Sequence, residues 1–211
     1  MQGLLTLAVS PFPATAYAAQ IKIMVKYLAQ ADRCRSFTNN LPLQLIKASE
    51  QLMADSSSTP RGELLGHWTF AGIDRVVHLR PGWGLGLSLS SSRVYNYESI
   101  NSENLHGWFQ GDGVTYLYTP ADLGQFNDDF WSTVDPYKLP GTTVDTAARA
   151  DGAGQSHLST RSWVGGATPD TNGVAGLELN PYGSSLTGKK SWFMFDDEVV
   201  CLGAGITCNN N

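Results

Sequence analysis

The sequence contains little charge, and that charge is not concentrated. Lysine, arginine, aspartate and glutamate make up 16% of the 211 residues, the net charge is −5, and no run of basic residues occurs. Nucleic-acid binding needs clustered lysine and arginine to displace counterions, so we expect no nucleic-acid partner. Disordered chains are rich in charge and poor in aromatic residues. The composition therefore predicts a folded protein, long enough to bury a core.

Long apolar runs and metal-binding motifs are also missing. No apolar run approaches the ~18 residues that span a membrane, so we expect no membrane partner. The three cysteines, Cys34, Cys201 and Cys208, form no C-x-x-C pair, which argues against structural zinc. They leave any disulfide pairing open, and the apolar neighbours of Cys201 predict a small buried residue. We expect neither a metal nor a cofactor.

Familiar catalytic and targeting motifs are absent too. The sequence has no G-x-S-x-G elbow, P-loop, H-E-x-x-H motif or Rossmann fingerprint. The four histidines fit no metal-ligand spacing, and we expect structural or surface residues held by hydrogen bonds. They are His67, His78, His106 and His157. Residues 4–18 imitate a signal peptide, but no positive charge precedes the short apolar stretch, so an ordinary helix is the alternative.

Two amphipathic helices are predicted in the first quarter of the chain. Apolar residues between 17 and 28 recur on a 3.6-residue period, with Thr15 as N-cap. A second apolar stripe runs over residues 45–53, after a start signal at residues 40–42. The polar break at residues 55–60 marks the expected domain boundary.

After residue 62 the period changes to two, which predicts an antiparallel β-domain. In residues 83–89, tryptophan or leucine alternates with glycine or serine, so one face of that strand carries almost no side chains. Three further segments show strand-like patterns: residues 114–118, 190–195 and 198–202. The last two flank Asp196-Asp197, which predicts a tight turn. We expect the glycine- and threonine-rich passage 141–154 to be loop.

The densest polar and aromatic segment runs from Arg93 to Gly113. It contains Asn101-Ser102-Glu103-Asn104 and, four residues later, Trp108. Amides and carboxylates form paired hydrogen bonds with sugar hydroxyls, and tryptophan covers the apolar face of a sugar ring. An equally good structural interpretation has the polar groups satisfying loop backbone while Trp108 fills the core.

Four segments, in the same order along the chain, resemble one enzyme family. Residues 101–113 read N-x-E-N-x-x-G-W-x-x-G-D-G, and residues 131–143 read W-S-T-V-D-P-Y-K-L-P-G-T-T. With residues 73–83 and 190–205, they resemble the central domain of polysaccharide lyase family 8, the hyaluronate, chondroitin AC and xanthan lyases. The resemblance covers residues 62 to 207, and residues 1–58 resemble the last helices of the family's helical domain only loosely.

The resemblance implies an α+β fold truncated at both ends. Residues 1–58 would be the C-terminal helices of an α/α toroid, and residues 62–211 a central antiparallel β-sandwich, or supersandwich. In this family the polymer lies in the cleft between the two domains, and the reaction is β-elimination at a uronate. The implied protein is a secreted, monomeric, cofactor-free lyase acting on hyaluronan-, chondroitin- or xanthan-type acidic polysaccharides. This chain would be a fragment of it that forms the β-domain wall of the carbohydrate-binding cleft.

The family's catalytic Asn, His, Tyr and Arg lie in toroid segments that this sequence lacks, so we predict that the chain alone is inactive. On the β-domain side, Glu103 resembles the carboxylate that supports the catalytic Tyr/Arg network, with Glu98 as the alternative. Asn104 resembles a substrate-contacting amide, and Asn101 and Trp108 are neighbouring candidates for substrate binding. Two other functions are considered: a non-catalytic carbohydrate-binding β-module and a purely structural β-domain.

Overall fold

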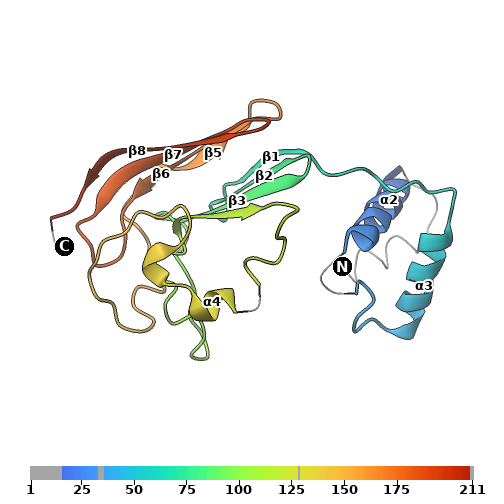
Figure 1. The fold of residues 1–211 in the computed structure, drawn as a ribbon, viewed down its shortest axis with the longest axis horizontal. Coiled ribbons are helices and arrows are strands. Elements are labelled where there is room, and N and C mark those ends of the chain that lie inside the picture. Colours follow the sequence, from blue (N-terminus) through green and yellow to red (C-terminus); the bar gives the residue numbers. More distant parts are fainter. Residues whose placement is uncertain (1–15, 33–35, 128, 210–211) are drawn as a thin grey trace. The chain divides into compact units, whose positions relative to one another are not determined.

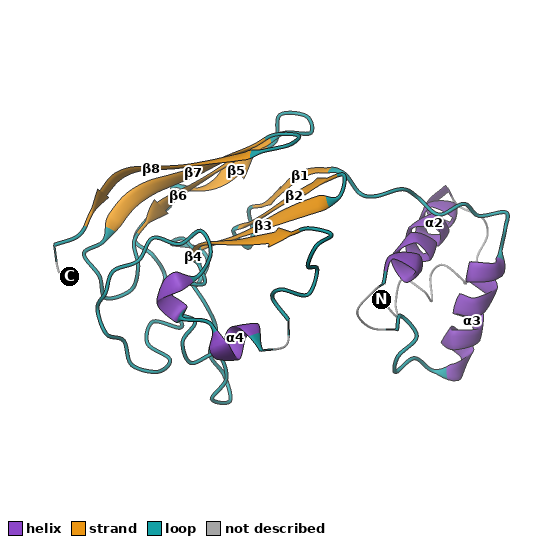
Figure 2. Ribbon diagram, in the orientation of Figure 1, coloured by secondary structure: helices purple, strands orange, loops and turns teal. Residues whose placement is uncertain are grey.

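The chain divides into two compact units, residues 1–63 and 64–211. The computed structural model describes residues 16–32, 36–127 and 129–209. Figure 2 shows helices in the first unit, and both sheets in the second. Thr15 and Cys34 lie outside the described residues. Within those ranges, no helix is long and apolar enough to cross a lipid bilayer.

The first unit contains the two predicted helices, α2 (Ala16–Ala31) and α3 (Leu43–Ala54). Their apolar stripes meet at Val25 and Leu52, which are 0% and 5% exposed. The Lys26 ammonium group donates a hydrogen bond to the Asp55 carbonyl oxygen at 2.5 Å, at the end of α3. The helical periodicity is therefore confirmed, whereas membership of a toroid stays a prediction.

The second unit contains eight strands in two four-stranded antiparallel sheets, each in simple up-and-down order (Figure 1). The first sheet consists of β1 (Gly66–Phe70), β2 (Arg75–Arg80), β3 (Trp83–Leu89) and β4 (Asp112–Tyr118). The second consists of β5 (Val164–Ala167), β6 (Gly173–Leu179), β7 (Thr187–Met194) and β8 (Val199–Thr207).

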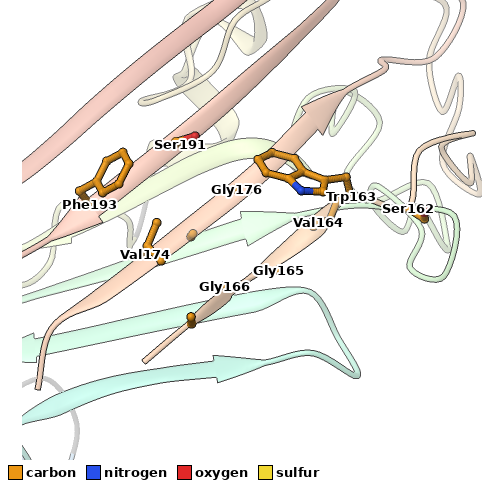
Figure 3. A pocket seen from close by; sticks show the side chains of 11 residues that line it. Ser162, Trp163, Val164, Gly165, Gly166, Val174, Gly176, Ser191 and Phe193 are labelled. Atoms are coloured by element: carbon orange, nitrogen blue, oxygen red, sulfur yellow. The ribbon is translucent and has the colours of Figure 1, made fainter. Parts of the chain in front are cut away.

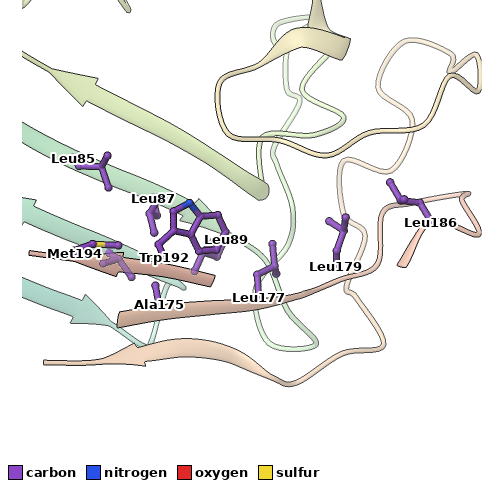
Figure 4. Close-up of a cluster of buried hydrophobic side chains, with 10 residues drawn as sticks. Leu85, Leu87, Leu89, Ala175, Leu177, Leu179, Leu186, Trp192 and Met194 are labelled. Atoms are coloured by element: carbon purple, nitrogen blue, oxygen red, sulfur yellow. The ribbon is translucent and has the colours of Figure 1, made fainter. Parts of the chain in front are cut away.

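The main core lies between these two sheets. Leucines from β3 meet alternate residues of β6 and β7, with Trp192 as the largest buried side chain (Figure 4). β6 is buried at every second residue, as expected for a strand with one inward face. Each methylene group removed from water contributes ~0.8 kcal/mol, so this layer stabilises the pairing of the sheets. The predicted antiparallel β-sandwich is confirmed.

The glycine-lined face of β3 is covered by aromatic residues. Tyr116 on β4 pairs with Gly86, and its ring lies 5.1 Å from Phe126 and 6.2 Å from Trp131, centre to centre. Trp131 belongs to the short helix α4 (Phe130–Thr133), which precedes the 3₁₀ helix η1 (Pro136–Lys138). Glycine on β3 therefore leaves space for large rings on its neighbour.

Loop 141–154 contains no helix or strand, as predicted, and its first residue fixes it to β4. Gly141 has φ +80°, and a Cβ atom there would lie 2.1 Å from Thr115 Oγ1. Only glycine tolerates both the left-handed backbone and this close approach.

β8 corrects one prediction from the sequence. Cys201 is exposed rather than buried, and so is every β8 residue from Val200 to Thr207. β8 is an edge strand of the second sheet and pairs only with β7 among the described strands. An apolar run therefore predicted a strand correctly without predicting its burial.

Candidate functional site

The polar segment found in the sequence forms a loop between β3 and β4, residues 93–111, on a buried frame. Tyr97 Oη donates to the Ala153 carbonyl at 2.8 Å, and Trp108 Nε1 donates to the Ala150 carbonyl at 3.1 Å. Asn96 Nδ2 donates to the Trp108 carbonyl at 2.9 Å. These bonds join the two flanks of the loop to each other and to loop 141–154.

The tip of loop 93–111 has an unusual backbone. Asn101, Ser102 and Asn104 have φ values of 53°, 62° and 54°, in the left-handed region that few non-glycine residues other than asparagine adopt. The Glu103 amide donates to the Ile100 carbonyl at 2.9 Å and closes a tight turn. The turn holds Asn101 and Glu103 at the surface, where both are exposed.

The two candidate carboxylates, Glu98 and Glu103, both lie on this rim. Each side chain is exposed, and each backbone is held locally. Asn104 donates to the Glu98 carbonyl at 2.7 Å, and Ser99 Oγ donates to the Glu103 carbonyl at 2.8 Å. Neither carboxylate forms a hydrogen bond or ion pair with any residue the structure describes. Both are therefore open to a ligand, and the geometry does not separate them.

Asn104 has a clear structural task. Its amide exchanges two hydrogen bonds with the Gln110 amide, at 3.0 and 3.1 Å, in addition to the bond to Glu98. Both of its N–H donors are thus used within the loop, which leaves acceptor capacity on Oδ1 for a sugar hydroxyl. Contact between Asn104 and the substrate stays a prediction.

Trp108 lies in the core rather than on the rim. It is 7% exposed, and its ring centre lies 5.5 Å from that of Tyr137 and 4.8 Å from that of His106. A sugar ring needs an open indole face, so burial argues against direct substrate contact and favours the structural interpretation. Its motif neighbour His106 is exposed, and His106 Nε2 lies 3.0 Å from Asp151 Oδ1, a pairing that the sequence did not suggest.

Charged groups are buried beneath the loop. The Arg149 guanidinium donates two hydrogen bonds to Asp145, at 2.7 and 2.9 Å, and lies 4.5 Å above the Phe109 ring. Burial raises the pKa of Asp112 to about 7, against the opposing effect of Lys190. Burial also lowers the pKa of Lys190 to about 8. Lys190 donates to the Gly141 carbonyl, so these charges connect β7 with loop 141–154.

The histidines are structural or surface residues, as predicted. His78 Nε2 lies 2.9 Å from the Phe195 carbonyl oxygen, so Nε2 carries the proton and donates to that oxygen. In this tautomer, His78 Nδ1 accepts a hydrogen bond from His67 Nδ1 at 3.4 Å. Burial lowers the pKa of His67 to about 4, which keeps it neutral at pH 7. Among the described residues, no group of three or more His, Cys, Asp or Glu side chains is arranged to hold a metal ion.

Comparison with known proteins identifies the family. Residues 65–211 match the model of the polysaccharide lyase family 8 super-sandwich domain. The chain is 44% identical to a hyaluronate lyase of Thermasporomyces composti over 170 residues, which cover 80% of this chain and 22% of that protein. It is 41% identical to the xanthan lyase of Bacillus sp. (strain GL1) over 196 residues, covering 93% and 21%.

Solved structures agree with the sequence comparison. A Paenibacillus xanthan lyase superposes with a TM-score of 0.86 at 48% identity, covering 99% of this chain and 20% of that one. A Streptomyces coelicolor A3 chondroitin AC lyase in complex with chondroitin sulphate gives 0.87 at 35% identity, covering 97% and 28%. The chain spans about a fifth of the length of the curated relatives it matches. It belongs to polysaccharide lyase family 8, and residues 65–211 match the super-sandwich domain of that family.

Proposed function

We propose that this chain forms the β-domain wall of the carbohydrate-binding cleft in a lyase that cleaves uronic-acid polysaccharides by β-elimination. In that reaction the proton beside the uronate carboxyl group is removed and the glycosidic C–O bond breaks. A carbon–carbon double bond forms in the sugar, and the departing oxygen takes up a proton. The substrate is an acidic polysaccharide of the hyaluronan, chondroitin or xanthan type.

The observation that carries the proposal is the exposed rim of loop 93–111 in a member of this family. Asn101 and Glu103 lie on a tight left-handed turn, and that turn stands on the buried residues Asn96 and Tyr97. A binding wall needs polar groups held in place before the substrate arrives, because ordering them on binding costs affinity. The hydrogen-bonded frame meets that requirement.

The residues of this wall support the elimination reaction but do not abstract the proton. Glu103 is assigned to hold the catalytic Tyr and Arg of a toroid by hydrogen bonds, and its free carboxylate suits that task. Asn104 and Asn101 are assigned to sugar hydroxyls, whereas Trp108 supports the loop from below. The proton-abstracting group lies on another part of the protein, so the chain alone is inactive. We further propose that the protein is secreted and monomeric.

A non-catalytic carbohydrate-binding module is the second candidate function. The open carboxylates and the left-handed turn would serve sugar binding without any lyase step. Turnover separates the two functions, because a binding module produces no unsaturated sugar in any context.

The test replaces the matching segment of the Paenibacillus xanthan lyase with this chain and measures unsaturated product by absorbance. In this chimera, Glu103→Gln is expected to lower kcat about 10–100-fold, the scale known for supporting partners around metal ligands. Asn104→Ala is expected to weaken substrate binding by about 1–3 kcal/mol.

Two controls make these results specific. Glu98→Gln changes the other exposed carboxylate, and a large loss there with none at Glu103 would transfer the supporting role to Glu98. Gln110→Ala breaks the amide pair with Asn104 without removing the Asn104 side chain. If Gln110→Ala and Asn104→Ala changed the kinetics equally, Asn104 would act through loop support alone. Melting temperatures measured on the same samples identify any purely structural loss.

A further inference from the structure

The outer face of the second sheet contains a groove that the proposed lyase site does not use. It is a cavity of about 440 Å³ over β5, β6 and β7, within the size range of small-molecule sites. Glycines form its floor, and the aromatic side chains Trp163 and Phe193 stand at its two ends (Figure 3). Trp163 is 53% exposed and Phe193 is 37% exposed.

The Trp163 ring lies close to β6 because residue 176 is glycine. A Cβ atom on Gly176 would lie 2.7 Å from the Trp163 ring, so only glycine at that position lets the ring lie so close to the strand. The Glu178 amide donates to the Trp163 carbonyl at 3.0 Å, which fixes the tryptophan backbone alongside β6. The indole is therefore both exposed and positioned, unlike the buried Trp108.

The charge at this end of the groove is positive. Lys189 Nζ lies 5.9 Å from the centre of the Trp163 ring, and Lys189 forms no ion pair among the described residues. Arg161 is compensated, because its guanidinium lies 3.1 Å from Glu178 Oε1. Two cations, Lys189 and Arg161, and one anion, Glu178, leave a net positive charge next to the half-exposed Trp163 ring, with the Lys189 ammonium over that ring. This arrangement favours a ligand with an apolar face and an anionic group.

We infer that this groove is a second polysaccharide-binding site, which takes one uronate-containing unit of an acidic polysaccharide outside the cleft. A sugar ring stacks on Trp163 and its carboxylate is held by Lys189. The inference rests on the proposed function for the class of ligand, but the site makes no contribution to the elimination step. A long polymer bound here would remain attached to the protein between cleavage events.

The test is binding of a hyaluronan hexasaccharide to the 211-residue chain, measured by calorimetry and by the indole N–H signals of its six tryptophans. Trp163→Ala is expected to weaken binding roughly tenfold, and Trp163→Phe to retain most of the affinity. Lys189→Gln is expected to weaken binding about two- to fivefold, with less salt dependence. Trp131→Ala, which removes another exposed tryptophan, is the matched control and is expected to change little.

Three results would overturn the inference. The first is unchanged affinity in Trp163→Ala. The second is equal binding of the carboxyl-reduced hexasaccharide, which would remove the anionic ligand from the proposal. The third is self-association through this face, seen as a dimer that Trp163→Ala abolishes. Glu103→Gln should leave the Trp163 signal response intact, so failure of this site and failure of the lyase proposal are read separately.

Discussion

At the scale of single residues, the charges buried beneath loop 93–111 have the largest expected effect on stability. The side chains of Asp145 and Arg149 are 0% and 6% exposed. Burial alone would raise the pKa of Asp145, but hydrogen bonds from Arg149 and Ser184 outweigh it and lower the pKa. Both partners are charged, so removing either one leaves an uncompensated charge inside the protein.

Arg149→Met is expected to lower the free energy of unfolding by about 3–5 kcal/mol, the usual cost of breaking a buried pair. Urea denaturation measures it. Lys138→Met is the control, because its ion pair with Asp135 is exposed and should contribute less than about 1 kcal/mol. Equal effects of the two substitutions would show that the Asp145 site is hydrated.

Asp112 should make stability depend on pH. Its pKa is about 7 in the folded chain, against an ordinary value of 3.8. A raised pKa contributes stability that is fully present below pH 4 and is lost as the pH rises through 7. Lys190, Arg149 and Asp145 are the charged groups that act on Asp112, and the positive charges of Lys190 and Arg149 limit the loss by favouring the ionised carboxylate.

Asp112→Asn removes this titration, so the variant should gain stability relative to the unmodified chain between pH 4 and pH 7.5. The difference in unfolding free energy between the variant and the unmodified chain is expected to change by about 2–4 kcal/mol from pH 4 to pH 7.5. Unfolding curves at the two pH values measure it. The lowered pKa of His67 makes the fold less stable below pH 6.5. Both proteins contain His67, so this effect cancels in the comparison. A pH-independent difference would contradict the assignment.

The candidate site shows which properties of a residue the sequence could predict. The run from Asn101 to Trp108 predicted a polar surface segment, and its polar residues from Asn101 to Asn104 do lie at the surface. The sequence could not predict that the Asn104 side chain donates its hydrogen bonds to Glu98 and Gln110, or that Trp108 is 7% exposed. The Asn104 bonds depend on how loop 93–111 turns back on itself. Trp108 is held by loop 141–154, which is distant in sequence and whose Ala150 carbonyl accepts from the indole.

At the scale of the elements, alternation predicted four of the eight strands. β3, β4, β7 and β8 appear where the pattern placed them. β1, β2, β5 and β6 were not predicted. In β5 and β6, small residues weaken the pattern: β5 reads V-G-G-A and β6 reads G-V-A-G-L-E-L. β5 lies on the outer edge of the second sheet, where a glycine-rich strand still forms because β6 supplies its hydrogen bonds.

β8 is expected to exchange its amide hydrogens faster than the interior strands of the same sheet. It pairs with β7 on one side only among the described strands, and its side chains are exposed, so few contacts oppose local opening. Hydrogen exchange followed by mass spectrometry should give weak protection over residues 203–207 and strong protection over β6. Uniform protection across the sheet would indicate that β8 is covered in solution.

At the scale of the whole molecule, the chain combines a family fold with a small share of its relatives' length. The comparisons assign it to polysaccharide lyase family 8, yet the chain covers 20% of the Paenibacillus xanthan lyase chain that it superposes on. The described residues offer exposed carboxylates, amides and an aromatic groove, which suit polymer binding. Under the proposed function, proton abstraction would fall to residues outside this sequence.

The most direct test of this assignment is turnover of a uronic-acid polysaccharide by the isolated chain and by the xanthan lyase chimera, assayed side by side. The isolated 211-residue chain is expected to produce no unsaturated sugar, because a missing general base alone commonly costs 10²–10⁴-fold in rate. The chimera, which combines this wall with an intact toroid, is expected to produce it. Turnover by the isolated chain that a single tyrosine substitution abolishes would contradict the account, and so would a correctly folded chimera with no activity.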